Sequence, residues 1–161
     1  MTITLTGFMG CGKSSTGREL ASMLGFPFVD LDEYIVHKAG QTIPEIFAES
    51  EQKFRFMEAE AIRDLLVMNE VSGRDMVIAL GGGTIMTPSV QNLILEHSFC
   101  IYLRTSLETI VKRVGPDTSS RPVFSTDLYP KRLATYEKAP YTVDTDGKSA
   151  REVAEEIKKF L

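Results

Sequence analysis

The chain has 161 residues, of which 43% are hydrophobic and 25% are charged, and its formal net charge is −4. The length and composition favour a single globular domain spanning residues 1–161, and the net charge gives no electrostatic reason to expect a nucleic acid partner. The chain has two cysteines, too few for a disulfide framework. No apolar run approaches the length of a membrane span, and no secretory leader precedes the first expected strand. We therefore expect a cytoplasmic protein that has no membrane partner.

Short strands and helices alternate along the chain. Ile3 and Leu5 alternate with threonines and predict a strand, and a helix is expected from Lys13 to the stop signal at Gly25. The 50–68 helix is expected to bury one face made of Phe54, Met57, Ala61, Leu65 and Met68. The other predicted strands are 28–30, 76–80, 99–103 and 141–143, and the other predicted helices are 31–38, 42–47, 88–96, 106–114, 128–138 and 150–160.

This alternation predicts an α/β fold, a parallel sheet with helices on both faces. Ligands of such sheets bind outside the carboxyl ends of the strands. Unusual polar or glycine-rich residues follow four of the expected strands: Gly7 to Ser14, Asp30 with Asp32, Gly81 to Gly83, and Arg104. We therefore expect these residues to gather along one edge of the sheet.

The loop after the first strand reads GFMGCGKS and matches the pattern G-x-x-x-x-G-K-[ST] over residues 7–14. Glycines let backbone amides turn toward an anion, and the following helix adds the positive end of its dipole. Lys13 would neutralise terminal phosphates and the Ser14 hydroxyl would bind Mg²⁺. The loop therefore predicts nucleotide binding, and its position suggests that the Cys11 thiol is accessible.

Three further features could complete such a site, and each has a plainer explanation. Asp30 and Asp32 could bind Mg²⁺ through water and orient an acceptor hydroxyl, or could only cap a helix. Arg55 lies between Glu51 and Glu58 and is either a clamp for a substrate carboxylate or part of a surface ion-pair ladder. The polar loop at 115–126 contains Arg121 and follows Arg113, and it could close over the phosphates or remain solvated.

The succession of motifs resembles shikimate kinase from end to end of the chain. It comprises GFMGCGKSSTGRELA, FVDLDEYI, the block from IPEIF to FR and E, ALGGGT, an arginine-proline lid and KRLATY. The resemblance implies transfer of the γ-phosphate of ATP to the 3-hydroxyl of shikimate, on the route to chorismate and aromatic amino acids. It also implies a P-loop three-layer α/β/α fold similar to nucleoside monophosphate kinases, with a five-stranded parallel sheet of order 2-3-1-4-5, Mg²⁺ as cofactor and a monomer.

The resemblance also implies roles for individual residues. Catalysis would fall to Lys13, Asp32 and Arg121. ATP would be bound by Gly10, Cys11, Gly12, Lys13, Ser14, Ser15, Arg113 and Arg121, with Arg113 stacked on adenine. Shikimate would be bound by Asp32, Arg55, Gly81, Gly82, Gly83 and Arg132, with backbone amides from the glycines and with Glu58 steadying Arg55. Ser14 would ligate the metal, and Asp30 would support it through water.

Two segments and one departure complete this expectation. The substrate-binding helical segment would cover about residues 31–60, and the lid would cover about residues 113–126. The TDGKSA segment after Asp144 departs from the adenine-binding pattern common in the family, so no adenine contact is predicted there.

Two other functions remain open from the residues alone. One is a kinase for another polyol acid, such as gluconate, on the same scaffold. The other is a nucleotide sensor without turnover, although paired arginines for a second anion argue against it.

Overall fold

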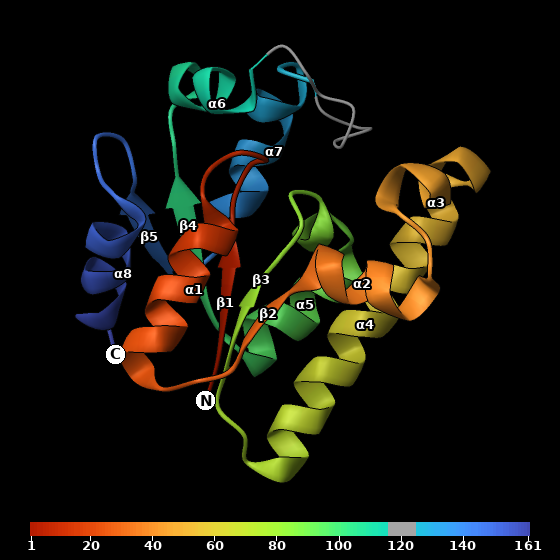
Figure 1. Ribbon diagram of the computed structural model, residues 1–161, viewed down its shortest axis with the longest axis horizontal. Coiled ribbons are helices and arrows are strands. Elements are labelled where there is room, and N and C mark those ends of the chain that lie inside the picture. Colours follow the sequence, from red (N-terminus) through yellow and green to blue (C-terminus); the bar gives the residue numbers. More distant parts are fainter. Residues whose placement is uncertain (116–124) are drawn as a thin grey trace.

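The structure is a computed structural model that describes residues 1–115 and 125–161. A five-stranded parallel sheet of order β2-β3-β1-β4-β5 forms its centre, as predicted (Figure 1). The strands are β1 (Thr2–Thr6), β2 (Phe28–Asp30), β3 (Met76–Ala79), β4 (Phe99–Arg104) and β5 (Tyr141–Asp144).

Each predicted helix is present within a few residues of its expected bounds. The helices are α1 (Lys13–Leu24), α2 (Leu31–Ala39), α3 (Ile43–Glu49), α4 (Glu51–Ser72), α5 (Pro88–His97), α6 (Leu107–Val114), α7 (Leu128–Tyr136) and α8 (Ala150–Lys158). One short 3₁₀ helix, η1 (Thr84–Met86), was not predicted. In the described ranges, none of the helices combines the length and apolarity that crossing a bilayer requires.

Two cores cover the two faces of the sheet, because successive strand residues point to opposite sides. On one side, strand residues such as Ile3 and Leu103 pack with α1 and α8 residues such as Leu20 and Ile157. On the other side, the buried residues include Ile78 and Tyr102 from strands with Ile62, Ile94 and Tyr136 from α4, α5 and α7. This three-layer packing confirms the predicted fold class.

The buried face of α4 differs from the predicted one at several positions, and Met57 is only partly buried. Met68 is 54% exposed, whereas Ile62 and Leu66 are buried. The true stripe also contains the polar residues Glu58 and Asn69, which a search for apolar side chains passes over. Once those two are included, the helical period leaves Met68 on the solvent side.

The carboxyl ends of the strands lie together at the top of the view in Figure 1. The loop between β1 and α1, the start of α2, the Gly81–Gly83 turn after β3 and the start of α6 therefore meet at that edge. Segments α2 and α3, with the first turns of α4, stand to the side of this edge. Local signals direct that path: Gly40 ends α2 with φ of 67°, and Thr42 and Glu45 form a capping box at α3.

Candidate active site

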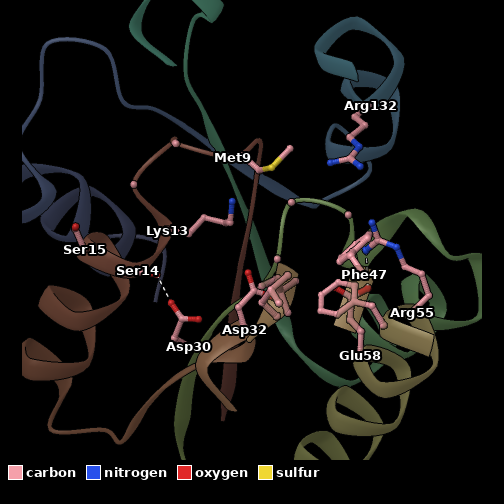
Figure 2. A pocket seen from close by; sticks show the side chains of 18 of the residues that line it. Met9, Lys13, Ser14, Ser15, Asp30, Asp32, Phe47, Arg55, Glu58 and Arg132 are labelled. Atoms are coloured by element: carbon pink, nitrogen blue, oxygen red, sulfur yellow. Dashed lines mark hydrogen bonds and ion pairs between the residues drawn. The ribbon is translucent and has the colours of Figure 1, made fainter. Parts of the chain in front are cut away.

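A cavity of about 370 Å³ lies at the carboxyl edge of the sheet (Figure 2). Nearly every predicted site residue in the described part of the chain lines it: Gly10, Gly12, Lys13, Ser14, Ser15, Asp30, Asp32, Arg55, Gly81, Gly82, Gly83, Arg113 and Arg132. Cys11 lines a neighbouring hollow instead. The predicted lid arginine, Arg121, and residues 116–124 of the predicted lid lie outside the described residues.

The loop between β1 and α1 has the conformation of an anion cradle. Gly7, Gly10 and Gly12 have φ of 152°, 82° and 92°, a region that side-chain-bearing residues rarely adopt. The Lys13 ammonium donates hydrogen bonds to the carbonyls of Gly7, at 2.8 Å, and Phe8, at 3.0 Å. The lysine is thereby held at the centre of the loop, beside the first turn of α1 and its exposed amides.

Cys11 is 2% exposed, so the suggestion that its thiol is accessible was wrong. Its side chain belongs to the core beneath α1, together with Leu5 and Leu103. The Cys11 amide donates to the carbonyl of Phe8 at 3.2 Å, within the loop itself. In this structure Cys11 therefore contributes to the shape of the loop.

Asp30 caps a helix and also contacts the phosphate loop. Its Oδ1 caps α2 by accepting from the Glu33 amide at 3.1 Å, and its Oδ2 accepts from the Ser14 hydroxyl. The cap orients the carboxylate toward the phosphate loop. The first helical turn of α1 and the start of α2 thus present two hard oxygen donors side by side (Figure 2).

Asp32 lies one helical position into α2 and points into the cavity near Lys13 (Figure 2). Its buried Oδ1 has no hydrogen-bond partner among the described residues. Burial raises the pKa of Asp32 from 3.8 to about 6, and the carboxylates of Glu58 and Asp30 add to the increase, whereas Lys13 and Arg55 oppose it. The carboxylate is therefore more basic than an ordinary aspartate and free to accept a proton or hydrogen bond.

Arg55 is held by a buried carboxylate and not by a surface ladder. Its Nη1 donates to Oε1 of Glu58 at 2.9 Å, and Glu58 is 2% exposed. The contact with Glu51, the exposed partner, is looser at 3.9 Å. Glu58 also accepts from the Thr84 hydroxyl at 2.7 Å. These bonds fix the guanidinium at the wall of the cavity, where its remaining donors can take a planar anion.

Arg132 reaches the same cavity from α7 (Figure 2). It is 8% exposed, and its buried Nη1 has no hydrogen-bond partner within the described ranges. A buried cationic donor that lacks a partner is costly, and an anionic ligand would supply one. One turn along α7, the Tyr136 hydroxyl donates to the carbonyl of Gly82 at 2.6 Å, and burial raises the pKa of that phenol.

The cavity is more cationic than the chain as a whole. The chain carries a net charge of −4. The cavity lining contains four cationic side chains against three acidic ones, namely Lys13, Arg55, Arg113 and Arg132 against Asp30, Asp32 and Glu58. A small acid or a phosphate can therefore bind here despite the acidic total.

Sequence reasoning missed most of the apolar part of the wall, namely Met9, Ile43, Phe47 and Leu80, which Phe54 completes. The rings of Phe47 and Phe54 pack with centroids 4.8 Å apart, and the Arg55 guanidinium lies over the Phe54 ring. The position of Phe54 beside Arg55 was the available signal. The contact between α3 and α4 that brings Phe47 to it depends on the fold.

The neighbouring hollow of about 240 Å³ also borders the phosphate loop, at Cys11 and Gly12. Arg113 lines both spaces, and its Nη1 donates to the carbonyl of Gly10 at 3.3 Å. Thr145, Lys148 and Ala150 also line this hollow. The two spaces share Gly12, Ser15 and Arg113 in their linings.

Comparison with known proteins agrees with this geometry. The family model described as "Shikimate kinase" matches residues 9–161. A shikimate kinase of Thermus thermophilus is 42% identical over 99% of this chain and 89% of its own length. A structure of shikimate kinase from Acinetobacter baumannii in complex with shikimate is 32% identical, with a TM-score of 0.90 over 99% of this chain and 91% of that one. The Aquifex aeolicus enzyme is 31% identical, with a TM-score of 0.85 over 99% and 95% of the two chains.

Proposed function

The chain belongs to the shikimate kinase family, and from that premise we infer that it transfers the γ-phosphate of ATP to the 3-hydroxyl of shikimate. The products are shikimate 3-phosphate and ADP, in the route to chorismate and aromatic amino acids. One observation carries the inference to this chain's own residues. A single cavity is lined by the phosphate loop, by Arg55 and Arg132, and by Asp32, which lies beside Lys13.

We propose that the loop amides and Lys13 bind the terminal phosphates of ATP. Gly10, Gly12, Ser14 and Ser15 line the phosphate side of the cavity, and α1 begins there. Lys13 already lies within this loop, so little reorganisation is needed before its ammonium contacts an anion. Such preset charge is most effective during phosphoryl transfer, when negative charge spreads over the equatorial oxygens.

We propose that Arg55 and Arg132 bind the carboxylate of shikimate. Arg55 is aligned by Glu58, and Arg132 is buried with a free donor. Two guanidinium groups from different helices can fix the orientation of a planar carboxylate as well as attract it. This orientation would direct the ring hydroxyls toward Asp32.

Asp32 is proposed to orient the attacking hydroxyl and to accept its proton. With a pKa of about 6 it is ionised at neutral pH and close enough to that pH for efficient proton transfer. Alignment of two bound substrates supplies on the order of 7–11 kcal/mol. We therefore rank positioning and cationic charge, including the proposed contribution of Arg121 from the lid, above base catalysis.

The residues present fit Mg²⁺. The Ser14 hydroxyl and the Asp30 carboxylate are oxygen donors in mutual contact, and we propose that Ser14 holds the ion directly and Asp30 through water. Within the described ranges there is no cluster of three His, Cys, Asp or Glu side chains able to hold a metal, in keeping with an ion that takes most ligands from phosphate and water. When bound, Mg²⁺ would neutralise charge on the β- and γ-phosphates.

The remaining assignments are proposals of the same kind. We place adenine in the hollow beside the loop, stacked on Arg113 and facing Thr145 and Lys148. We treat residues 1–161 as one domain in which the segment of about 31–60 binds the acid. We further propose a cytoplasmic monomer without nucleic acid or membrane partners, in line with the acidic total charge.

The decisive experiment follows ADP release from ATP with and without shikimate, and with gluconate and other polyol acids as comparison acceptors. We expect release that depends on shikimate, with a product phosphorylated at the 3-hydroxyl. Release that depends on another acid would identify a different kinase. ATP binding without acceptor-dependent release would identify a nucleotide sensor.

A further inference from the structure

The Gly81–Gly83 turn links the end of β3 to η1 and borders the cavity. None of its three glycines has a positive φ, since the positive-φ glycines among the described residues lie elsewhere. Gly83, for example, has φ of −105° and ψ of 0°. An L-residue could adopt this conformation at position 83, so the need for glycine there is one of space.

The space beside Gly83 is filled by Arg55. A Cβ built on Gly83 would lie 2.6 Å from Nη2, 2.7 Å from Nη1 and 2.9 Å from Cζ of that guanidinium. These separations are shorter than real Cβ contacts, and Glu58 holds the same guanidinium in place at 2.9 Å. A methyl group at residue 83 would therefore displace the proposed carboxylate clamp.

The space beside Gly81 is filled by three side-chain oxygens. A Cβ there would lie 3.0 Å from Oγ1 of Thr84, 3.1 Å from Oδ1 of Asp32 and 3.2 Å from Oε2 of Glu58. The Thr84 hydroxyl donates to Glu58, which links the turn to α4. Gly81 thus lets the two carboxylates approach the same strand end.

The space beside Gly82 is shared by the phosphate loop and α7. A Cβ there would lie 3.0 Å from Cγ of Met9 and 3.4 Å from Nη1 of Arg132. The Gly82 carbonyl accepts the Tyr136 hydroxyl of α7 at 2.6 Å. The turn is therefore bonded to α4 through Thr84 and to α7 through Tyr136, the two helices that carry the arginines.

We propose that the three glycines are positioning residues, each acting through a particular neighbour: Gly83 through Arg55, Gly81 through Asp32 and Glu58, and Gly82 through Met9 of the phosphate loop, with Arg132 in ordinary contact. The turn is the spacer that sets the two arginines and the aspartate at their working separation. This role rests on the proposed function, and it adds to any contact of the turn's amides with the substrate. The energy involved is packing energy, which is felt strongly where neighbours cannot move away.

The sharpest test is a double-mutant cycle of Gly83→Ala and Arg55→Ala. Gly83→Ala should raise the KM for shikimate by about 10- to 100-fold, as expected for a misplaced binding group, and should leave the KM for ATP unchanged. In the Arg55→Ala background the same substitution should add less than about twofold, because the side chain through which it acts is gone. Full additivity of the two effects would overturn the proposal.

Thermal unfolding of the same four proteins, without substrates, gives a second cycle. Gly83→Ala should lower the unfolding midpoint of the wild type and lower it much less when Arg55 is absent. If Gly83→Ala alone does not fold, recovery of a folded protein in the double variant supports the proposal, and failure of that variant contradicts it. Thermal unfolding does not need turnover, so it tests the spacer role alone. The ADP release assay on the wild type tests the proposed function separately.

Gly17 of α1 supplies a matched control. It is also buried with an ordinary φ, and a Cβ there would lie 2.4 Å from the Phe28 ring, outside the cavity. Gly17→Ala should therefore lower the unfolding midpoint without changing the ratio of the two KM values. A change in that ratio as large as the change caused by Gly83→Ala would mean that general destabilisation explains both, and would overturn the proposal.

Removing the hydrogen bond from the Tyr136 hydroxyl to the Gly82 carbonyl tests the turn without adding atoms to it. Tyr136→Phe should raise the KM for shikimate a few-fold and leave that for ATP unchanged. Tyr102→Phe is the control, since the two rings are stacked, with centroids 5.3 Å apart, and no bond joins the Tyr102 hydroxyl to the turn in the described structure. Equal effects of both substitutions would contradict an anchoring role for Tyr136.

Discussion

Two glycine-rich loops follow neighbouring strands of the sheet, and they need glycine for partly different reasons. The loop after β1 needs it for backbone conformation, since Gly7, Gly10 and Gly12 all have positive φ, and at Gly7 also for space, since a Cβ there would lie 2.8 Å from the Leu103 carbonyl oxygen. The turn after β3 needs it for space, since Gly81–Gly83 have ordinary φ and side chains occupy the positions where Cβ atoms would lie. The same residue type thus serves two kinds of binding site at one sheet edge.

The difference corresponds to what each loop is proposed to bind. Phosphate is recognised by backbone amides, which a positive-φ loop can turn toward one point. A carboxylate on a ring is recognised by side-chain forks, and these must be packed closely and aligned by partners such as Glu58. One half of the site is therefore made of main chain and the other of side chains, with Lys13 and Asp32 where they meet (Figure 2).

The largest effect is expected from removing the Lys13 charge, which serves the phosphate-binding half of the site. Lys13→Met keeps the length of the side chain but removes the charge that lies within the loop. We expect kcat to fall by about 10³-fold or more, the size typical of lost charge stabilisation in a transition state. Shikimate affinity, measured by titration without ATP, should stay within about twofold. Loss of shikimate binding of similar size would mean that the two halves are not separable.

The next effect breaks the side-chain half. Arg55→Ala should raise the KM for shikimate by about 10²-fold, because a charge-assisted contact is lost and Glu58 is left buried without its cation. The KM for ATP should hardly change. Arg113→Ala is the matched control, and it should show the opposite pattern. Equal effects of Arg55→Ala on both substrates would contradict its role as a carboxylate clamp.

A smaller effect sharpens the contrast between the two kinds of glycine. Gly12 has φ of 92°, yet a Cβ there would meet Arg113 only at 3.6 Å, an ordinary contact. Gly12→Ala should therefore weaken ATP binding through backbone strain of about 1–2 kcal/mol, or roughly 5- to 30-fold. Adding Arg113→Ala should not relieve the strain at residue 12, whereas removing the Arg55 side chain should relieve the clash that Gly83→Ala creates. Relief at Gly12 would show that crowding, and not backbone strain, acts at that position.

Much of this fold could be predicted from the sequence because its signals are local. The strands alternate or are continuously apolar, the helices carry caps such as Thr42 with Glu45, and the phosphate loop has a fixed spacing. The order of the strands came from resemblance to a family, since periodicity does not reveal which strands pair. The short helix η1 was missed because three residues after a glycine run leave no periodic pattern.

The site was predicted less completely, and the reason is three-dimensional. Residue spacing pointed to Arg55 but could not decide between Glu51 and Glu58 as its main partner, a choice that depends on which carboxylate is buried. Only the family resemblance favoured Glu58. The sequence pointed to the Gly81–Gly83 turn but not to the side chains packed against it, because Tyr136 is more than 50 residues away in the chain. Contacts between distant elements have no signature in a single sequence.

The smallest expected effect concerns stability at the junction of the two halves. Because the pKa of Asp32 is raised from 3.8 to about 6, its ionised form is disfavoured in the folded protein. Between these pH values the folded state binds more protons than the unfolded state, so stability falls as pH rises through that window. Above about pH 6 the full penalty applies, on the order of 1–2 kcal/mol after allowance for partial solvent exposure.

Asp32→Asn removes this penalty together with the charge. The variant should be more stable than wild type at pH 7.5, and the difference should disappear near pH 4, as measured by denaturant unfolding without nucleotide or metal. Its kcat should be sharply lower at the same time. Asp144→Asn is the control of opposite sign, since Arg104 lowers the pKa of Asp144, and its loss should not stabilise the protein at any pH. A wild-type kcat in Asp32→Asn would remove this residue from the mechanism. An unchanged free energy of unfolding would mean that the carboxylate is better solvated than its burial indicates.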